Sequence, residues 1–415
     1  MIQNIALSSF ISYRKGKPAR KTLLSEAQYL PVLTPEYLRG NDEAETTAVT
    51  NDLVVIDGGE IVLLWDGSNA GEFFKARRGI LASTMVVFDF DEACFDKDYL
   101  YYALKSFEPY LKAQTSGSGI PHVDKNILLN HRIQRLQKPE QSKIAEVLAT
   151  VDRAIEQTEA LNSKYRRIKT GLMQDLLTRG IDENGNLRDP ATHRFKPSPL
   201  GLIPQEWELS SLGQLSKRIT SGSRGWAKYY AEEGAKFIRI GNLTREHVNL
   251  LLEDIQHVTP PAGSEGKRTA LETGDLLVSI TADLGIIGVV PEELGEAYIN
   301  QHIALVRIDK EQANPWWIGN FLAGHKAQQL IAALNDAGAK AGLNLPTVAS
   351  IPVPIPDMKE QDEITQILCQ VDGALNTEKA YLTKLRRLKA GLMQDLLTGK
   401  VPVASLLDIA KGEST

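Results

Sequence analysis

The sequence predicts an α+β protein in which two mixed α/β globular domains are separated by two long coiled-coil helices. Two observations lead to this fold class. A helical segment occurs twice, and short apolar runs with strand character precede each occurrence. At ~150 residues per domain, 415 residues leave room for two or three domains, each with its own core. We therefore expect the order globular segment, helix, globular segment, helix.

The first globular segment comprises residues 1–138. Three short apolar runs in it have strand character: Tyr29-Leu-Pro-Val-Leu33, Asp52-Leu-Val-Val-Ile56 and Ser83-Thr-Met-Val-Val-Phe88. An aromatic, helix-like stretch follows, Tyr99-Leu-Tyr-Tyr-Ala-Leu104. The segment is thus expected to mix strands with at least one helix.

A long helix is expected over residues 139–180 because this part of the chain is repeated. Glu140–Thr178 recurs as Glu360–Thr398 at an offset of 220, with 20 of 39 aligned positions identical. The last eight residues, Gly171–Thr178, are unchanged in the second copy. Shared helical periodicity alone would not produce an identical run of that length, so the segment has been duplicated.

Both copies have a heptad pattern and contain no proline. We assign the a positions to every seventh residue from Ile144 and from Ile364, and the d positions three residues later, from Val147 and Ile367. Each helix spans ~37 residues, or about 55 Å. Neither could bury its apolar stripe alone, so the two are expected to pack together. Gly171 and Gly391 interrupt the pattern, which indicates close packing, a bend or a helix end.

The second half of the chain repeats this order. Residues 181–206 form a linker rich in proline and glycine, residues 207–356 the second globular segment, residues 357–398 the second helix and residues 399–415 a tail. Strand-like runs occur at 236–240, 274–280 and 302–308, and an aromatic helix-like stretch at 316–322. The acidic-then-apolar element at Asp52 is matched with that at Asp275, so the two globular segments are interpreted as diverged copies of one fold.

Composition narrows the function classes. The formal net charge of −5 argues, as a whole-chain average, against a nucleic-acid partner. Two cysteines exclude a disulfide scaffold and a cysteine-rich metal site and suit a reducing compartment. No apolar run approaches the ~18–20 residues that span a bilayer, and Met1–Ile5 does not begin a signal peptide. We expect a soluble, cytoplasmic protein without membrane contact.

No catalytic motif is complete. No Gly-x-Gly-x-x-Gly follows a strand, no Gly-Lys-Ser/Thr is present, and the seven histidines lack zinc spacing. Asn314-Pro-Trp-Trp317 lacks the second proline of an amino-methyltransferase site, and Asp357-Met-Lys359 lacks the upstream acid of a nuclease site. We therefore assign no catalytic residue and no metal ligand to this chain, and expect any catalysis to belong to partners.

The duplicated Glu-Gln…Gly-Leu-Met-Gln-Asp-Leu-Leu-Thr helices resemble those of the specificity subunit of type I restriction-modification systems. Two further stretches are similar to that family: Phe195–Trp207, with its Pro-x-x-Trp ending, and Ile219–Trp226 followed by Phe237–Leu243. The resemblance covers essentially the whole chain. The first globular segment differs from the second in lacking the Pro-x-x-Trp lead-in.

The resemblance implies that residues 1–138 and 207–356 are target recognition domains, each reading one half of a split double-stranded DNA target. It also implies an antiparallel coiled coil that separates the two readers and docks two methyltransferase subunits, with restriction and translocase subunits joining the complex. By the same resemblance, the partners are expected to use S-adenosylmethionine, ATP and magnesium, whereas this chain is expected to need no cofactor. The docking residues implied on the helices are Gly171, Leu172, Met173, Leu176, Gly391, Leu392, Met393 and Leu396. A duplicated reader on a duplicated helix makes a pseudo-twofold monomer, and two different readers imply an asymmetric target.

DNA contacts are expected from cations, hydroxyls, amides and aromatic residues in two cationic runs, in the Phe237–Asn242 stretch and in two small-residue loops before the helices, because such groups bind phosphates and base edges. The alternatives are an ordinary solvated loop at Tyr13–Lys21, a surface turn with its tryptophan in the core at 217–230, and flexible structural loops at 115–122 and 337–344. The candidates are Arg14, Lys15, Lys17, Arg20, Lys21, His122, Lys125, Arg218, Ser221, Ser223, Arg224, Trp226, Lys228, Tyr229, Arg239, Asn242, Lys340 and Asn344.

The sequence thus favours a non-catalytic DNA-recognition subunit. A second interpretation is a coiled-coil scaffold or adaptor whose globular domains bind proteins. A third, a self-contained modification enzyme, is disfavoured by the missing motifs.

Overall fold

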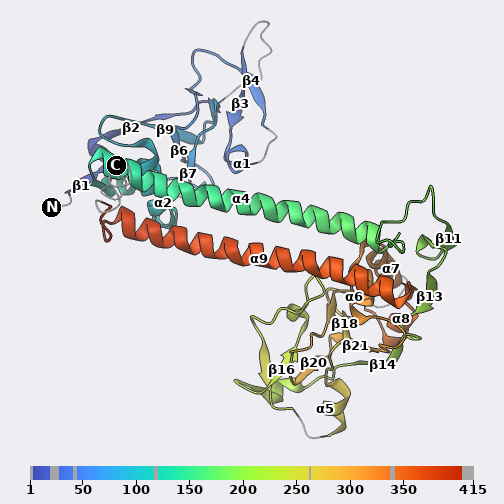
Figure 1. The fold of residues 1–415 in the computed structure, drawn as a ribbon. Coiled ribbons are helices and arrows are strands. Elements are labelled where there is room, and N and C mark those ends of the chain that lie inside the picture. Colours follow the sequence, from blue (N-terminus) through green and yellow to red (C-terminus); the bar gives the residue numbers. More distant parts are fainter. Residues whose placement is uncertain are drawn as a thin grey trace, which may run out of the picture. The chain divides into compact units, whose positions relative to one another are not determined.

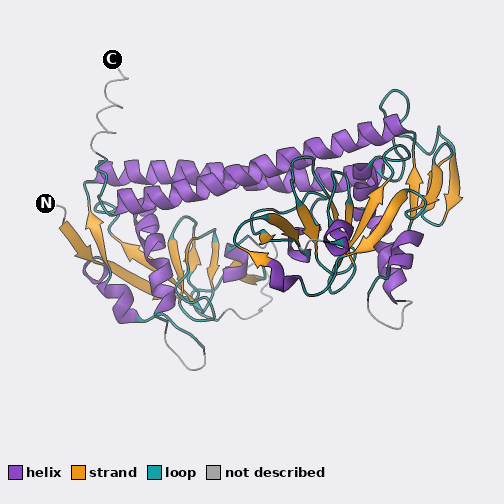
Figure 2. Ribbon diagram, turned by 90° about the horizontal axis from the view of Figure 1, so that it is seen from below, coloured by secondary structure: helices purple, strands orange, loops and turns teal. Residues whose placement is uncertain are grey.

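A computed structural model describes residues 3–18, 28–40, 44–115, 120–260, 263–336 and 342–403. The chain forms two compact units, one of residues 1–159 with 380–415 and one of residues 160–379. Each unit contains a globular part and a segment of each of two long helices, α4 (Lys138–Leu176) and α9 (Met358–Leu397), which Figure 1 labels. In Figure 2 the strands lie in the globular parts.

The globular part of the first unit holds two four-stranded sheets. One has the order β2-β9-β6-β7 with all neighbours antiparallel, and the other has the order β4-β3-β8-β5, in which β3 and β8 are parallel. Strands β1 and β10 form a separate antiparallel ribbon. The elements are β1 (Gln3–Ala6), η1 (Leu7–Ser9), β2 (Ile11–Lys15), β3 (Tyr29–Leu33), α1 (Pro35–Leu38), β4 (Thr46–Ala48), β5 (Val55–Ile56), β6 (Ile61–Leu64), β7 (Phe73–Lys75), β8 (Gly79–Leu81), β9 (Met85–Phe90), α2 (Lys97–Ala113), α3 (Lys125–Asn130) and β10 (Arg132–Arg135).

The globular part of the second unit repeats the antiparallel sheet and the ribbon, but its other sheet has the parallel pair at an edge instead of in the middle. Its sheets have the orders β14-β21-β18-β19 and β15-β17-β16-β20, with β16 and β20 parallel, and β13 pairs with β22 as β1 pairs with β10. The elements are β11 (Phe195–Ser198), β12 (Gly201–Pro204), β13 (Glu208–Ser211), β14 (Ser216–Ser221), η2 (Trp226–Tyr229), β15 (Tyr230–Ala231), β16 (Ala235–Ile238), η3 (Ile240–Asn242), β17 (Gln256–Val258), α5 (Ser264–Thr269), β18 (Leu276–Ser279), β19 (Ile287–Val289), β20 (Ala297–Ile299), β21 (Ile303–Ile308), α6 (Pro315–Ala323), α7 (His325–Asp336), α8 (Leu345–Ser350) and β22 (Pro352–Ile355).

The order of strands in the sheets shows that the match between the elements at Asp52 and Asp275 was wrong. β18 occupies the place that β6 has in the first unit, so the acidic-then-apolar element at Asp275 corresponds to Glu60-Ile61 and not to Asp52. Only Val55 and Ile56 of the Asp52–Ile56 run are in a strand. Both elements have an acid followed by apolar residues, and that pattern is too short to fix an alignment.

Side-chain hydrogen bonds at equivalent places repeat in the two units. The Tyr99 hydroxyl of α2 donates to the carbonyl of Gln134 (2.9 Å), and Trp317 Nε1 of α6 donates to the carbonyl of Pro354 (3.0 Å), which lies 220 residues further on. Gln141 Oε1 accepts from the N-cap residue of α2, and Gln361 Oε1 accepts in the same way from the N-cap residue of α6. These bonds tie the start of each long helix to the first turn of a helix in its globular part.

Within each unit the two long helices run antiparallel. In the first unit Asp152 pairs with Lys389, while residues near Ile144 pack with residues near Leu396. In the second unit Lys169 pairs with Asp372, while residues near Leu176 pack with residues near Ile364. As the number rises on one helix it falls on the other. The surfaces along which the helices meet are called the seams below.

The heptad assignment was right for the a positions and wrong by one residue for the d positions. Ile144 and Ile364 are fully buried, but the next seam residues are Leu148 and Leu368. Further along the first helix the seam includes Asn162 and Lys169. The apolar pattern predicts a d position at Ile168, but this side chain is 40% exposed. Its neighbour Lys169 enters the seam instead, and a lysine is not recognised by a search for apolar periodicity.

Candidate nucleic-acid interface

In the first unit the structure brings Lys15, His122 and Lys125 together around two aromatic rings. Tyr13 of β2 stacks on Trp65, which follows β6, with ring centroids 5.0 Å apart. Lys125 Nζ, at the start of α3, lies 5.8 Å from the centre of the Tyr13 ring. Lys15 Nζ pairs with Asp66 Oδ2 at 2.7 Å, and Asp66 forms an isolated backbone bridge with His122. This group, the Trp65 cluster, combines cations with partly exposed aromatic faces.

The cationic run after Tyr13 is partly neutralised within the unit. Arg14 makes a two-bond pair with Asp89 of β9, with both N–O distances 2.8 Å, and this pairing raises the pKa of Arg14. Gly16 must be glycine because a Cβ there would lie 2.1 Å from the carbonyl oxygen of Ala82. Lys17 is exposed and makes no ion pair with a residue that the structure describes. Arg20 and Lys21 lie outside the described residues.

In the second unit the loop after β14 is held by Arg268, a residue that the sequence analysis missed. Its guanidinium donates to the Thr220 hydroxyl (2.8 Å), to the Ser221 carbonyl (2.6 Å) and to the Ser223 hydroxyl. The Arg268 carbonyl accepts from the guanidinium of Arg218. Arg218 and Ser223, both proposed as DNA contacts, therefore have partners within the unit. Arg268 lies 44 residues beyond the loop tip, in α5, so no local pattern indicated it.

The tip of this loop presents cations to solvent. Arg224 is exposed and makes no ion pair with any described residue, and Gly225 after it has φ 86°, a conformation that favours glycine. Lys228 is also exposed, with Nζ 4.8 Å from the centre of the Tyr229 ring. Among the candidates on this loop, Arg224 and Lys228 are exposed and Tyr229 is half-buried, so they remain accessible for DNA.

Trp226 is a core residue, as the alternative interpretation stated. Its side chain is 2% exposed, and it stacks on Phe237 at a centroid distance of 5.1 Å. It also contacts the rings of Tyr298 and Tyr229. A ring enclosed on these sides cannot reach a duplex, so its listing as a DNA contact was wrong. Trp226 therefore anchors the loop that carries Arg224 in the core of the second unit.

Both asparagines among the candidates have local structural roles. Asn242 is buried and holds the turn around η3, accepting from the amide of Arg239 (2.9 Å) and donating to the carbonyl of Leu251 (2.9 Å). Its assignment to DNA was therefore wrong. Asn344 is exposed but caps α8 by accepting from the amide of Thr347 at 2.8 Å. Lys340 lies outside the described residues.

Arg239 remains accessible. It lines a hollow of about 360 Å³ with Asn300, Asp254 and the η3 turn. Arg239 itself, the residue before η3, is half-buried.

The docking residues expected on the long helices fall into three groups by exposure. Gly171 and Gly391 are exposed, and a Cβ on either would meet nothing within 4 Å, so close packing does not explain these glycines. Leu176 and Leu396 are buried in the cores of their own units and cannot dock a partner, which corrects that part of the assignment. The half-buried residues are Leu172, Met173, Leu392 and Met393.

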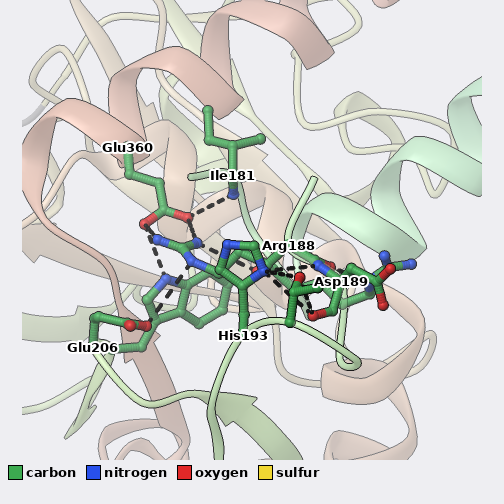
Figure 3. Close-up of polar contacts among 9 residues, drawn as sticks. Ile181, Arg188, Asp189, His193, Glu206 and Glu360 are labelled. Atoms are coloured by element: carbon green, nitrogen blue, oxygen red, sulfur yellow. Dashed lines mark hydrogen bonds and ion pairs between the residues drawn. The ribbon is translucent and has the colours of Figure 1, made fainter. Parts of the chain in front are cut away.

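A buried polar cluster attaches the linker to the start of α9 (Figure 3). Glu360 accepts both guanidinium donors of Arg188, at 2.5 and 3.0 Å, the Trp207 indole N–H at 3.1 Å and the Ile181 amide at 2.8 Å. Burial disfavours the guanidinium charge, but the bonds from Glu360 outweigh it and raise the pKa of Arg188. A Cβ on Gly180, whose φ is 61°, would collide with all three side chains.

The two copies of this glutamate are used differently. Glu140, the equivalent of Glu360, caps its own helix by accepting from the Gln137 amide at 3.0 Å. The first globular segment lacks the Pro-x-x-Trp lead-in that supplies Trp207, so the duplicated motif has a buried partner set in one copy only.

Neither a metal site nor a membrane-spanning helix is found among the residues that the structure describes. Within them no group of three or more His, Cys, Asp or Glu side chains is arranged to hold a metal ion. Within the same residues, no helix is both long enough and apolar enough to cross a membrane.

A family model, "Type I restriction modification DNA specificity domain", matches this chain at residues 2–164 and again at 204–387. The type I restriction enzyme MjaVIII specificity subunit of Methanocaldococcus jannaschii is 30% identical over 416 residues, covering 97% of this chain and 93% of the relative. This chain belongs to the family of type I restriction-modification specificity subunits.

One further relative and two solved structures are less similar to this chain in sequence. The EcoBI subunit of Escherichia coli is 21% identical, covering 85% of this chain and 79% of the relative. The solved S subunit of M. genitalium shares the fold with a TM-score of 0.63 at 17% identity, covering 96% of each chain. A second solved structure is described as showing the structural basis of complex assembly and conformational transition of the type I R-M system. It has a TM-score of 0.52 at 15% identity, covering 95% of this chain and 97% of that chain.

Proposed function

We propose that this specificity subunit recognises an asymmetric, split double-stranded DNA target, with one half read by residues 1–138 and the other by residues 207–356. The observation that carries the proposal is the double match of the family model, which coincides with an antiparallel sheet that recurs as β2-β9-β6-β7 and β14-β21-β18-β19. The loops that would face DNA differ in sequence between the copies, so the two half-sites should differ.

The helices, residues 139–180 and 357–398 in this proposal, act as an antiparallel coiled-coil spacer related by a pseudo-twofold axis. Support comes from the seam pairs. Asp152 pairs with Lys389, and their counterparts at an offset of 220, Asp372 and Lys169, pair with each other. An exchange of this kind is the contact pattern of a twofold interface. Residues 181–206 link the two halves, and residues 399–415 form the tail.

The described surface suits a reader that works inside a complex. Arg14 and Lys15 are paired with acids, whereas Arg224, Lys228 and Lys17 are exposed. A few placed cations suffice for base and phosphate contacts, but a chain of net charge −5 should bind DNA weakly by itself. Two methyltransferase subunits, docked on the helices around Gly171 and Gly391, would supply further positive surface.

Catalysis is assigned to the partners in this proposal. Methyl transfer to a base requires its extrusion from the duplex into a pocket, which the methyltransferase subunits would provide with S-adenosylmethionine. Cleavage and translocation would belong to restriction subunits that use ATP and magnesium. The subunit itself would bind DNA in the cytoplasm and would make no contact with a membrane.

A footprint on DNA tests the proposal. The full chain and its cognate methyltransferase, purified together, should protect two short segments separated by an unprotected gap. The isolated chain should bind the same duplex weakly and transfer no methyl groups. Protein binding without any footprint would favour the scaffold interpretation, and methyl transfer by the isolated chain would overturn the assignment of catalysis.

A further inference from the structure

The seam of the second unit contains a buried ion pair that also reaches the globular part. Lys169 Nζ of α4 lies 2.5 Å from Asp372 Oδ1 of α9, and these side chains are 9% and 7% exposed. The same Nζ donates to the carbonyl oxygen of Glu246 at 2.6 Å, in the loop after η3. One ammonium group therefore joins α4, α9 and the reader of that unit.

The seam of the first unit has a similar ion pair, which is only partly buried. Lys389 Nζ of α9 lies 2.5 Å from Asp152 Oδ1 of α4, with both side chains 25% exposed. Asp152 Oδ2 accepts from the Tyr102 hydroxyl of α2 at 2.8 Å, and Lys389 Nζ lies 5.7 Å from the centre of the Tyr102 ring. Burial, followed by the bond to Asp152, raises the pKa of Tyr102, so the hydroxyl stays a donor. This pair too joins both helices to the reader.

A buried ion pair adds little stability, because removing two charges from water costs about as much as their attraction returns. Its best-supported use between helices is to fix register, since a slipped helix leaves a charge buried without a partner. Apolar residues of the second unit's long helices, among them Leu172 and Ile364, would accept a slip more easily. A slip of one helical turn is ~5.4 Å, the length of one to two base pairs at ~3.4 Å each.

We propose that Asp152, Lys169, Asp372 and Lys389 are positioning residues that determine which gap between the half-sites is accepted. Each pair fixes the register of the helix segments in its unit and holds the reader against them. The inference rests on the proposed function, because it assumes two readers on a common spacer.

The test uses the full chain with its methyltransferase partner and a set of duplexes that carry both half-sites at different gaps. K169M/D372L replaces the pair with apolar side chains of similar volume, so folding should be retained. We expect the wild-type complex to prefer one gap. In the variant complex, methylation at gaps one base pair longer and shorter should rise by about tenfold relative to the preferred gap.

Three further variants sharpen the result. K169R keeps the charge and donors and should keep the wild-type preference, as should R386A, which breaks the exposed helix–helix pair between Arg386 and Glu159. D152L/K389M should broaden the preference as K169M/D372L does, and it decides the question if the latter does not fold.

Folded variants with the wild-type gap preference would overturn this inference while leaving the proposed function standing. A wild-type complex that methylates all gaps equally would refute the proposed function, and this inference with it.

Discussion

Removal of Arg188 should destabilise the second unit strongly. Arg188 and Glu360 have side chains only 9% and 6% exposed, and the carboxylate would keep only the Ile181 amide and the Trp207 indole as donors. Leaving a buried charge without its counter-ion costs about 3–5 kcal/mol. At about 2–4 °C per kcal/mol for a unit of this size, R188A should lower the melting temperature by about 6–20 °C.

Tryptophan fluorescence during thermal unfolding measures this effect, because most tryptophans belong to residues 160–379: Trp207, Trp226, Trp316 and Trp317, with only Trp65 in the other unit. The matched control is R14A, which also removes a two-bond carboxylate pair, but one whose side chains are 55% and 43% exposed. An exposed pair contributes about 0–1 kcal/mol.

The reasoning would be refuted if R188A shifted the melting temperature no more than R14A does. A double variant provides a second check. Because the two residues act on each other, R188A/E360A should be less destabilised than the sum of the single variants by about 1–3 kcal/mol. Simple additivity would mean that the pair is not coupled.

Three further outcomes are expected. R224A should weaken or relax recognition of one half-site by about 1–3 kcal/mol in a binding-site selection if Arg224 reads a base, and an equal effect on both half-sites would contradict that role. Inserting four residues, ~6 Å, into one long helix should change the preferred gap by one or two base pairs of ~3.4 Å in a methylation assay, and an unchanged gap would exclude the spacer role. His131 stacks on Phe107, and burial lowers its pKa from its ordinary value of 6.5 to about 4, so the unfolded chain binds the proton more readily. Its contribution to stability is therefore complete above about pH 6.5 and lost as pH falls toward about 4. The stability of the wild type relative to H131F, from denaturant unfolding, should decline across that range, and a constant difference would contradict the shift.

Much of the fold could be predicted from the sequence because the chain repeats itself. An identical run such as Gly171–Thr178 fixes an offset, and heptad periodicity identified both long helices. The d positions were misplaced because the seam takes Lys169 where apolar periodicity favours Ile168. A charged residue that is buried with its counter-ion looks, in sequence, like a surface residue.

The candidate site was predicted less completely. The sequence pointed to the cationic stretch at 217–230, in which Arg224 and Lys228 are exposed, and their contact with DNA stays a prediction. Residue type alone could not show that Trp226 is enclosed by aromatic rings, or that the side-chain amide of Asn242 forms hydrogen bonds within a turn. Arg268 was missed because its partners around Ser221 are far away in sequence and are brought to it only by the fold.

The most direct test of the account is the DNA sequence that the complex modifies. Sequencing the methylated bases in DNA exposed to the full chain and its methyltransferase should yield two different short sequences separated by a gap of fixed length and unspecified bases. A single contiguous motif, or modification without sequence preference, would contradict the assignment of one half-site to each globular segment.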